Sequence, residues 1–310
     1  MTMQYLTQLF NEISALLMSF LIAIGAVTVP STHDPVQNKN PDAIIDFVVT
    51  GDTQICTYMP EREANLMAFS QDILNSEEEL DAFIIVGDVA ENGMEDEFQR
   101  LSSYIRDFNT KNFILAPGNH DIRLREWEQS KNRFYGMMNE LNGTTTEYPN
   151  AYYKHVVNGY TFLIIASDES RFEDAYISNA QLQWLNVELK EATATGKPVF
   201  VLSHYPLAEG HGLPNTWGSG DSNGEGTLPT YERKNDYDFV GSIGKQSNDV
   251  YDILTKYQNV FFITGHLHTG FGKYTYEALN VENNVHGVNV PSVGIDNKDD
   301  CIFVNFFQTG

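Results

Sequence analysis

From residue 43 onward, short hydrophobic runs alternate with stretches in which apolar residues recur at helical spacing. The runs are rich in β-branched and aromatic side chains, which favours buried strands. They lie at residues 44–49, 83–86, 112–115, 161–166, 198–202 and 260–264. The stretches with helical spacing lie at 61–75, 94–108, 178–189 and 250–257. This alternation of strands and helices predicts an α/β fold.

The predicted helix near residue 180 also carries a start signal. Ser178 and Gln181 have the spacing of a capping box, in which each side chain bonds the other residue's backbone amide. Beyond residue 270 the pattern becomes strand-like, with hydrophobic runs at 288–290 and 302–307 and no further helical stripe.

Five of the predicted strands end in a short turn that contains Gly or Pro and also Asp, Asn or His. The polar residues of these turns are Asp52, Asp88, Asn119, His120, Asp121, His204, His266 and His268. Taken singly, each is also typical of a helix cap or a turn. Because side chains at the carboxyl ends of strands gather in one crevice of an α/β sheet, five such ends together predict one shared site.

Six of these side chains are oxygen or imidazole donors, which suit Mn, Zn, Fe or Mg. They are Asp52, Asp88, Asn119, His204, His266 and His268. One carboxylate can bridge two ions about 3.5–4 Å apart, so a dinuclear centre that clamps a phosphoryl group is expected. His120 directly follows Asn119, and we expect it to act as a metal-free general acid that Asp121 orients. The alternative for His120 is a structural histidine.

In their order, these motifs resemble those of the calcineurin-like metallophosphoesterases. The matching segments are Gly51-Asp52-Thr53-Gln54, Gly87-Asp88-Val89-Ala90-Glu91-Asn92-Gly93, Gly118-Asn119-His120-Asp121, His204 and Gly265-His266-Leu267-His268. The resemblance spans about residues 44–270. It implies a four-layer α-β-β-α sandwich of two mixed sheets flanked by helices, in which 288–290 and 302–307 complete the second sheet.

The resemblance also implies a role for each residue. Asp88 would bridge two divalent or trivalent metal ions (Mn, Fe, Zn or Mg), and His120 would be the acid that contacts phosphate. Asp52 and His268 would bind the first ion, and Asn119, His204 and His266 the second. Gln54 stands where the family usually has a histidine, and its amide oxygen is a harder and weaker ligand than imidazole. Gln54 therefore stays a candidate metal ligand and leaves the identity of the metal open.

The implied function is hydrolysis of phosphate mono- or diesters by in-line attack of a metal-bound hydroxide. The alternative is a catalytically weakened metal-binding or scaffold protein of the same fold, which only Gln54 supports. The net charge of −23 disfavours long nucleic acid as a partner, because like charges repel. Small phosphoesters, nucleotides or phosphorylated surface molecules are the expected substrates. Two cysteines, Cys56 and Cys301, are too few for a disulfide framework, and whether they pair stays open.

Two further segments carry their own expectations. Residues 13–29 form an apolar run without charge, so residues 1–30 are expected to be a signal peptide or membrane anchor, followed by a polar linker at 31–42. The chain would then be secreted or membrane-anchored and extracytoplasmic; the alternative is a helix packed on the domain. Residues 43–310 would be the phosphoesterase domain, with a long loop insertion at 205–245. Candidate substrate contacts are His211, Trp217, Tyr231 and Arg233 in that loop, and Arg123 and Arg125 after the catalytic turn. The alternatives are a disordered surface loop and surface arginines that pair with nearby acids such as Glu126 or Glu128.

Overall fold

The computed structural model describes residues 43–76, 79–122, 126–171, 174–208, 210–212, 241–268 and 275–294, and the backbone of 305–308. All of them belong to one compact unit, residues 40–310. The predicted signal peptide or anchor, the linker, most of the loop insertion and Cys301 lie outside the described residues. Within the described ranges, no helix is long and apolar enough to cross a membrane.

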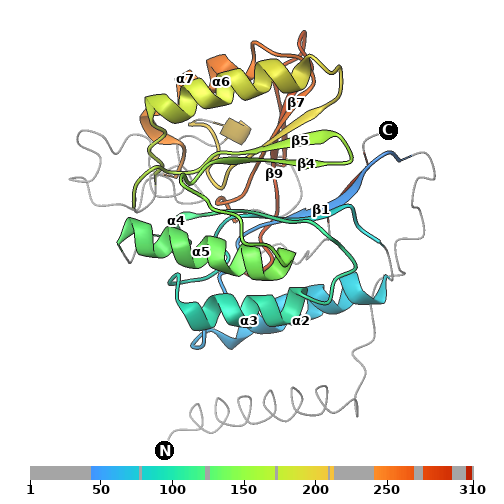
Figure 1. The fold of residues 1–310 in the computed structure, drawn as a ribbon, viewed down its shortest axis with the longest axis vertical. Helices are drawn as coiled ribbons and strands as arrows, with labels where there is room; N and C mark the ends of the chain where they lie inside the picture. The colour runs from blue at the N-terminus through green and yellow to red at the C-terminus, as the bar shows by residue number, and fades with distance from the viewer. Residues whose placement is uncertain are drawn as a thin grey trace, which may run out of the picture. The chain divides into compact units, whose positions relative to one another are not determined.

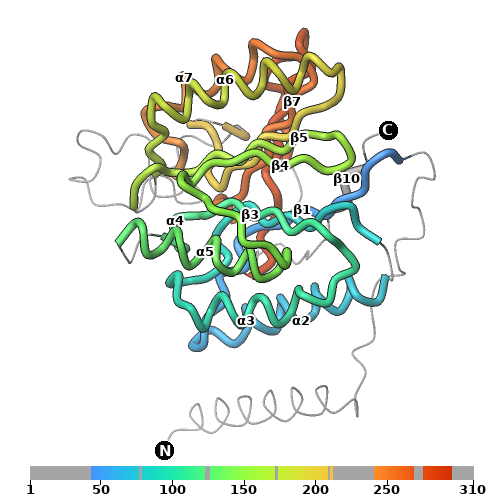
Figure 2. The backbone as a smooth tube through the Cα atoms, in the orientation of Figure 1, coloured from blue at the N-terminus to red at the C-terminus, as the bar shows by residue number. Residues whose placement is uncertain are grey.

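The first sheet has four strands in the order β10-β1-β2-β3. Its strands are β1 (Asp46–Thr50), β2 (Ala82–Val86), β3 (Phe113–Ala116) and β10 (Asn305–Gln308). β1, β2 and β3 run parallel, whereas β10 pairs antiparallel with β1, beside which it lies in Figure 2. The parallel strands therefore bring their carboxyl ends to one edge of the sheet.

The second sheet has six strands in the order β4-β5-β6-β7-β9-β8. Its strands are β4 (Tyr153–Val157), β5 (Tyr160–Ile164), β6 (Val199–Leu202), β7 (Val260–Thr264), β8 (Tyr276–Asn280) and β9 (Val285–Asn289). The four central strands β5, β6, β7 and β9 are parallel, and the two edge strands are antiparallel to their neighbours. Both sheets are therefore mixed.

The helices cover the outer faces of the two sheets, as Figure 1 shows. The first sheet packs on α2 (Pro60–Asn75), α3 (Glu95–Ile105) and α5 (Trp127–Asn142), and the second on α6 (Asn179–Thr193) and α7 (Ser247–Leu254). In β1, Val48 packs with the helices, whereas Phe47 and Val49 point between the sheets. There the Phe47 ring contacts those of Phe162 and Phe200 edge-on, with centroids 5.4 and 5.0 Å apart. The predicted four-layer α-β-β-α sandwich is confirmed.

Two expectations about individual elements are wrong. The run at 302–307 was expected to complete the second sheet, but β10 joins the first sheet. Ser178 does cap α6, since its hydroxyl accepts a hydrogen bond from the backbone amide of Gln181 at 3.2 Å. The second bond of a capping box, from the Ser178 backbone amide to the Gln181 side chain, does not form, because that amide donates to Asp168. The Gln181 side chain is fully buried and bonds both the amide and the carbonyl of Ala166 instead. A buried amide group must satisfy its oxygen and its nitrogen together, and Ala166 offers partners for both.

Candidate active site

The carboxyl ends of β1, β2 and β3 meet those of β6 and β7 from the facing sheet. Backbone hydrogen bonds connect the turns in pairs: the Asp52 amide donates to Gly87 at 3.0 Å, and the Gly265 amide to His204 at 3.0 Å. The segment after β9 crosses to the first sheet, where the Ser292 hydroxyl and the Gly294 amide both donate to the Asp52 carbonyl. The five strand ends predicted to share one site therefore do converge, although they come from two sheets.

One cluster of ligand atoms is formed by Asp88, His204 and His266, all within 4.8 Å of one another. His204 Nε2 lies 3.2 Å from Asp88 Oδ2, 2.9 Å from His266 Nδ1 and 3.1 Å from Asn119 Oδ1. All four side chains are buried. Because the Val86 carbonyl can only accept, His204 Nδ1 must donate to it at 2.9 Å, which makes Nε2 the atom available to a ligand.

A second cluster is formed by Asp52, Asp88 and His268, again within 4.8 Å. His268 Nε2 lies 3.2 Å from Asp52 Oδ1, and the side-chain amide of Gln54 donates through Nε2 to Asp88 Oδ2 at 3.1 Å. Asp88 belongs to both clusters and so lies between them. The structure thus brings together all seven residues that the sequence singled out as candidate metal ligands.

The backbone of this site is held in an unusual conformation. Five of the candidate ligands have φ in the left-handed region, which non-glycine residues rarely adopt. They are Asp52 (53°), Gln54 (39°), Asp88 (51°), His266 (72°) and His268 (49°). Each such residue costs about 1–3 kcal/mol, and strain of this kind gathers at functional sites. Asp and His adopt this region more readily than most residues, but Gln54 does not share that preference, so the surrounding packing must hold at least this conformation.

Two motif glycines leave room for the ligands. A Cβ atom at Gly118 would lie 2.2 Å from Asp88 Oδ1, and one at Gly87 would lie 2.6 Å from the His204 ring. Gly87 also has φ of 87°, which a larger residue would adopt only with strain. Glycine is therefore required at both positions for the side chains to come this close.

Within the clusters, neighbouring charges shift the pKa values of the buried side chains. Burial opposes protonation of His204, but Asp88 beside it raises the pKa of His204 to about 9. Burial and the charge of His204 hold the pKa of His266 well below its usual range. Burial alone would raise the pKa of Asp88, yet His204 and His120 keep it well below normal. The buried Asp88 carboxylate is therefore balanced by the positive charge of the His204 imidazole beside it.

The donor set fits metal ions. His204 Nε2 faces two oxygens that only accept, one of Asp88 and one of Asn119, so a proton or a cation must lie among them. Gln54 Oε1 and Asn119 Nδ2 are buried, and neither has a hydrogen-bond partner among the described residues. Carboxylate, amide and imidazole donors together suit first-row transition metals and magnesium.

A family model described as calcineurin-like phosphoesterase matches residues 45–270. The chain belongs to this family. A protein named probable cyclic nucleotide phosphodiesterase from Fibrobacter succinogenes is 25% identical over 168 residues, which are 54% of this chain and 57% of that relative. The crystal structure of a dimetal phosphatase from Danio rerio matches 82% of this chain and 89% of its own, with a TM-score of 0.55 and 14% identity. At that identity, the likeness bears on the fold alone.

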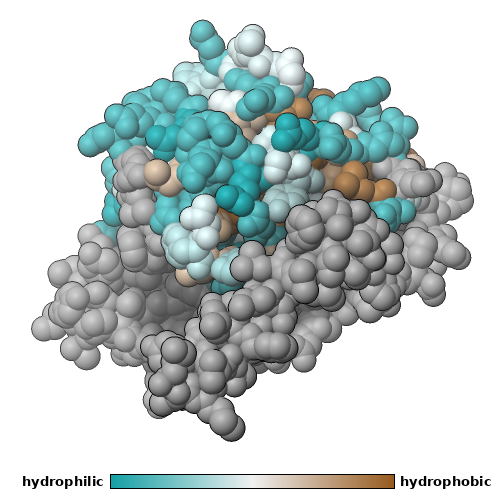
Figure 3. Space-filling model, turned by 90° about the horizontal axis from the view of Figure 1, so that it is seen from below, coloured by the Kyte–Doolittle hydropathy of each residue, from teal (hydrophilic) through white to brown (hydrophobic). Residues whose placement is uncertain are grey.

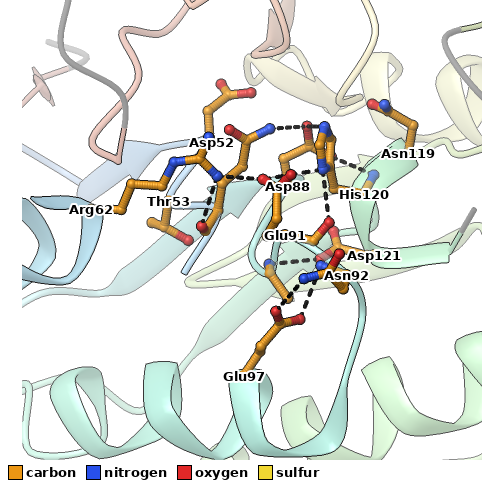
Figure 4. A network of polar contacts seen from close by, with 12 residues as sticks. Asp52, Thr53, Arg62, Asp88, Glu91, Asn92, Glu97, Asn119, His120 and Asp121 are labelled. Atoms are coloured by element: carbon orange, nitrogen blue, oxygen red, sulfur yellow. Dashed lines mark hydrogen bonds and ion pairs between the residues drawn. The ribbon is translucent and has the colours of Figure 1, made fainter. Parts of the chain in front are cut away.

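His120 lies at the edge of this family site and is 14% exposed. Its backbone amide donates to Asp88 Oδ1 at 2.9 Å, and its Nε2 lies 3.9 Å from Asp88 Oδ2. Its Nδ1 donates to the Glu91 carbonyl at 2.8 Å and lies 3.4 Å from the Glu91 carboxylate. Arg62 in turn forms an ion pair with Glu91 (Figure 4). Sequence reasoning missed Arg62 and Glu91, although Glu91 lies within a motif that it quoted.

Asp121 does not orient His120, contrary to the expectation. Its carboxylate accepts from the amides of Val89 at 3.3 Å, Ala90 at 3.0 Å and Gly118 at 2.8 Å, and bonds no atom of His120. Burial and the nearby Asp88 raise the pKa of the Asp121 carboxyl to about 7. Asp121, in the turn after β3, is therefore joined by hydrogen bonds to the loop after β2.

Of the candidate substrate contacts in the loop insertion and after the catalytic turn, His211 alone lies among the described residues. His211 is only 3% exposed, and its amide donates to the Glu277 carboxylate on β8 at 2.7 Å. This bond anchors the base of the loop on the second sheet. Trp217, Tyr231 and Arg233, and likewise Arg123 and Arg125, lie outside the described residues.

Proposed function

We propose that this chain hydrolyses phosphate mono- or diesters with the help of two metal ions. The observation that carries the proposal is the position of Asp88 in two adjoining clusters of ligand atoms, because a shared carboxylate is the feature that joins a metal pair. Family membership and the fold support the same reading.

Asp88 would bridge the two ions. Asp52, His268 and Gln54 would complete one coordination shell, and Asn119, His204 and His266 the other. Gln54 would present its amide oxygen, which needs a half-turn of the amide away from the bond it now donates to Asp88. A metal pair held there would activate water as the nucleophile and neutralise charge that builds up on the phosphoryl group.

His120 would donate the proton that the leaving group needs. Nδ1 donates its hydrogen to the Glu91 carbonyl, so Nε2 faces Asp88 and the site. The proton passed to the leaving group would be the Nε2 proton of the imidazolium form, which leaves a neutral ring that still carries the hydrogen on Nδ1. A general acid in this position typically contributes about 10²–10⁴-fold to the rate. Replacing His120 by Asn would then slow esters with poor leaving groups most, since good leaving groups depart without a proton.

Small phosphoesters, nucleotides or phosphorylated surface molecules are the substrates that we propose. The relative from Fibrobacter succinogenes is named for cyclic nucleotides, which makes these a sensible first choice for assay. The net charge of −23 argues against long nucleic acid. Because this chain spans 57% of that relative, the relative's activity does not transfer directly.

The test combines metal analysis with hydrolysis assays of the full chain. Metal content is measured after loading with Mn, Fe, Zn or Mg, and hydrolysis is followed with p-nitrophenyl phosphate, bis-p-nitrophenyl phosphate and cyclic nucleotides. Asp88→Asn should lose metal and at least about 100-fold in activity, beyond what outer-shell changes cost. Asp252→Asn, an exposed residue of α7, is the matched control and should behave like the parent chain. Metal binding without any hydrolysis would support the scaffold alternative, and no metal binding at all would overturn the proposal.

A further inference from the structure

We propose that Arg62 is a positioning residue that holds Glu91 in place against His120, and so aims His120 at the leaving group. The inference deepens the proposed function and rests on it, because His120 is there the acid. It assigns a role to a helix that otherwise only covers the first sheet.

Arg62 lies in the first turn of α2 and reaches across to two loops of the site. Its guanidinium donates to the Gln54 carbonyl at 3.2 Å and forms an ion pair with the Glu91 carboxylate (Figure 4). The side chains of Arg62 and Glu91 are only 14% and 13% exposed. Removing one partner from a pair so far withdrawn from water leaves a poorly solvated charge, so the contact is costly to break.

Glu91 meets His120 through two of its atoms. The carbonyl oxygen accepts from Nδ1 at 2.8 Å, and the carboxylate lies 3.4 Å from the same nitrogen. Without Arg62, the carboxylate would turn toward Nδ1 or toward a bound cation, because both attract it more than the protein interior does. The pair with Arg62 therefore holds the Glu91 carboxylate in its present position and leaves Nδ1 bonded to the carbonyl.

The same guanidinium also supports the Gln54 side of the site. Gln54 has φ of 39°. Arg62 donates to its backbone carbonyl, while its side-chain amide donates to Asp88 Oδ2 at 3.1 Å. Arg62 thus joins the loop after β1 to the loop after β2. Both contacts come from one guanidinium nitrogen, Nη1, whose two hydrogens point in fixed directions within the guanidinium plane, whereas the hydrogens of a lysine ammonium rotate.

A purely structural role in α2 does not account for Arg62. A positive charge in the first turn opposes the helix dipole, and the neighbouring Glu61 and Glu63 already supply the favourable sign. Arg62 therefore lies where the helix itself gains nothing from it. Its two bonds both lead to loops that carry site residues.

The test compares Arg62→Met and Arg62→Lys with the parent chain, each in full length and loaded with Mn. Two monoesters with the same phosphate are used, p-nitrophenyl phosphate with a good leaving group and phenyl phosphate with a poorer one. We expect kcat for phenyl phosphate to fall roughly 10- to 100-fold in Arg62→Met, as outer-shell changes usually cost, with a much smaller loss for p-nitrophenyl phosphate. KM should change little, and Arg62→Lys should be intermediate.

Arg100→Met is the matched control. Arg100 pairs with Glu63 at 2.8 Å, so this variant breaks an ion pair of the same type between α2 and α3 without touching a loop of the site. It should affect both esters equally and slightly. If Arg62→Met also affects the two esters equally, Arg62 is structural and the inference is wrong.

A second measurement does not depend on turnover. In the metal-free ¹⁵N-labelled chain, the His120 imidazole nitrogens should report a proton on Nδ1, and Arg62→Met should shift that signal while Arg100→Met should not. If Arg62→Met does not fold, Arg62→Lys carries both measurements. An inactive parent chain would overturn the proposed function alone, whereas an unshifted His120 signal would overturn the role of Arg62.

Discussion

Gly118 has no side chain, and Asp88 occupies the space that one would fill. A Cβ atom at this position would meet Asp88 Oδ1 at 2.2 Å, closer than real atoms approach. Since Asp88 is the residue shared by both ligand clusters, Gly118→Ala should displace it and disrupt both. We expect a loss of metal and of at least about 100-fold in activity, measured by metal analysis and by hydrolysis of p-nitrophenyl phosphate.

Gly136 provides the control for this change. It is an exposed glycine inside α5, and a Cβ there would meet no atom within 4 Å. Gly136→Ala should therefore stabilise the chain by about 0.5–1 kcal/mol, because alanine loses less backbone entropy in a helix. Equal activity losses in the two glycine variants would show that Gly118 has no special relation to Asp88.

Gln54 decides how firmly the first metal would be held. Its amide oxygen is a weaker donor than the imidazole that the family usually has here. Gln54→His should raise metal affinity or change the preferred metal, which titration calorimetry with Mn and Zn can measure. The exposed Gln99→His is a useful control, since the Gln99 side chain lies on the outside of α3, where its one bond to a described residue is to Glu95. Unchanged affinity in Gln54→His would show that this side chain is not a ligand.

At the scale of elements, Asp121 connects two turns. Asp121→Ala would leave three backbone amides without their acceptor, at about 1–3 kcal/mol each where they are buried. We expect a loss of several kcal/mol in the free energy of unfolding, measured by urea denaturation, with a milder effect in Asp121→Asn. A variant that keeps its stability but loses activity would instead restore the orienting role first expected for Asp121.

The helices, strands and turns differ in how far the sequence predicts them. The turns after β1, β2, β3, β6 and β7 were predictable, because each polar residue directly follows a buried strand. The sheet to which β10 belongs was not predictable, because a hydrophobic run indicates that a strand is buried but not which strand it pairs with. The bond between Arg62 and Glu91 was also out of reach, because it joins residues 29 positions apart whose local patterns carry no sign of it. Contacts decided by tertiary packing are the ones that sequence patterns miss.

At the scale of the whole molecule, the net charge repels an anionic substrate, whereas cations bound at the site would attract it. The net charge of −23 surrounds a centre that, in our proposal, holds cations and takes anions. On the face seen in Figure 3, the described surface is mainly hydrophilic, and the exposed large hydrophobic residues are spread over many elements. An anionic phosphoester that approaches the protein is therefore repelled by the negative surface, and it would meet positive charge only at the metal site.

This balance predicts an unusual response to salt. The Debye length falls from about 30 Å at 0.01 M to about 8 Å at 0.15 M ionic strength. Added salt therefore screens the distant negative charges but hardly affects contacts within the buried site. We expect kcat/KM for a dianionic monoester to rise roughly two- to fivefold over this range, and less for a monoanionic diester, because the repulsion scales with substrate charge. The measurement is initial rates at low substrate in sodium chloride of increasing concentration, with metal content checked at each step. A fall in kcat/KM with added salt would mean that attraction by the positive charge of the site outweighs repulsion by the net negative charge, even at long range. The charge argument against long nucleic acid as a substrate would then fail as well.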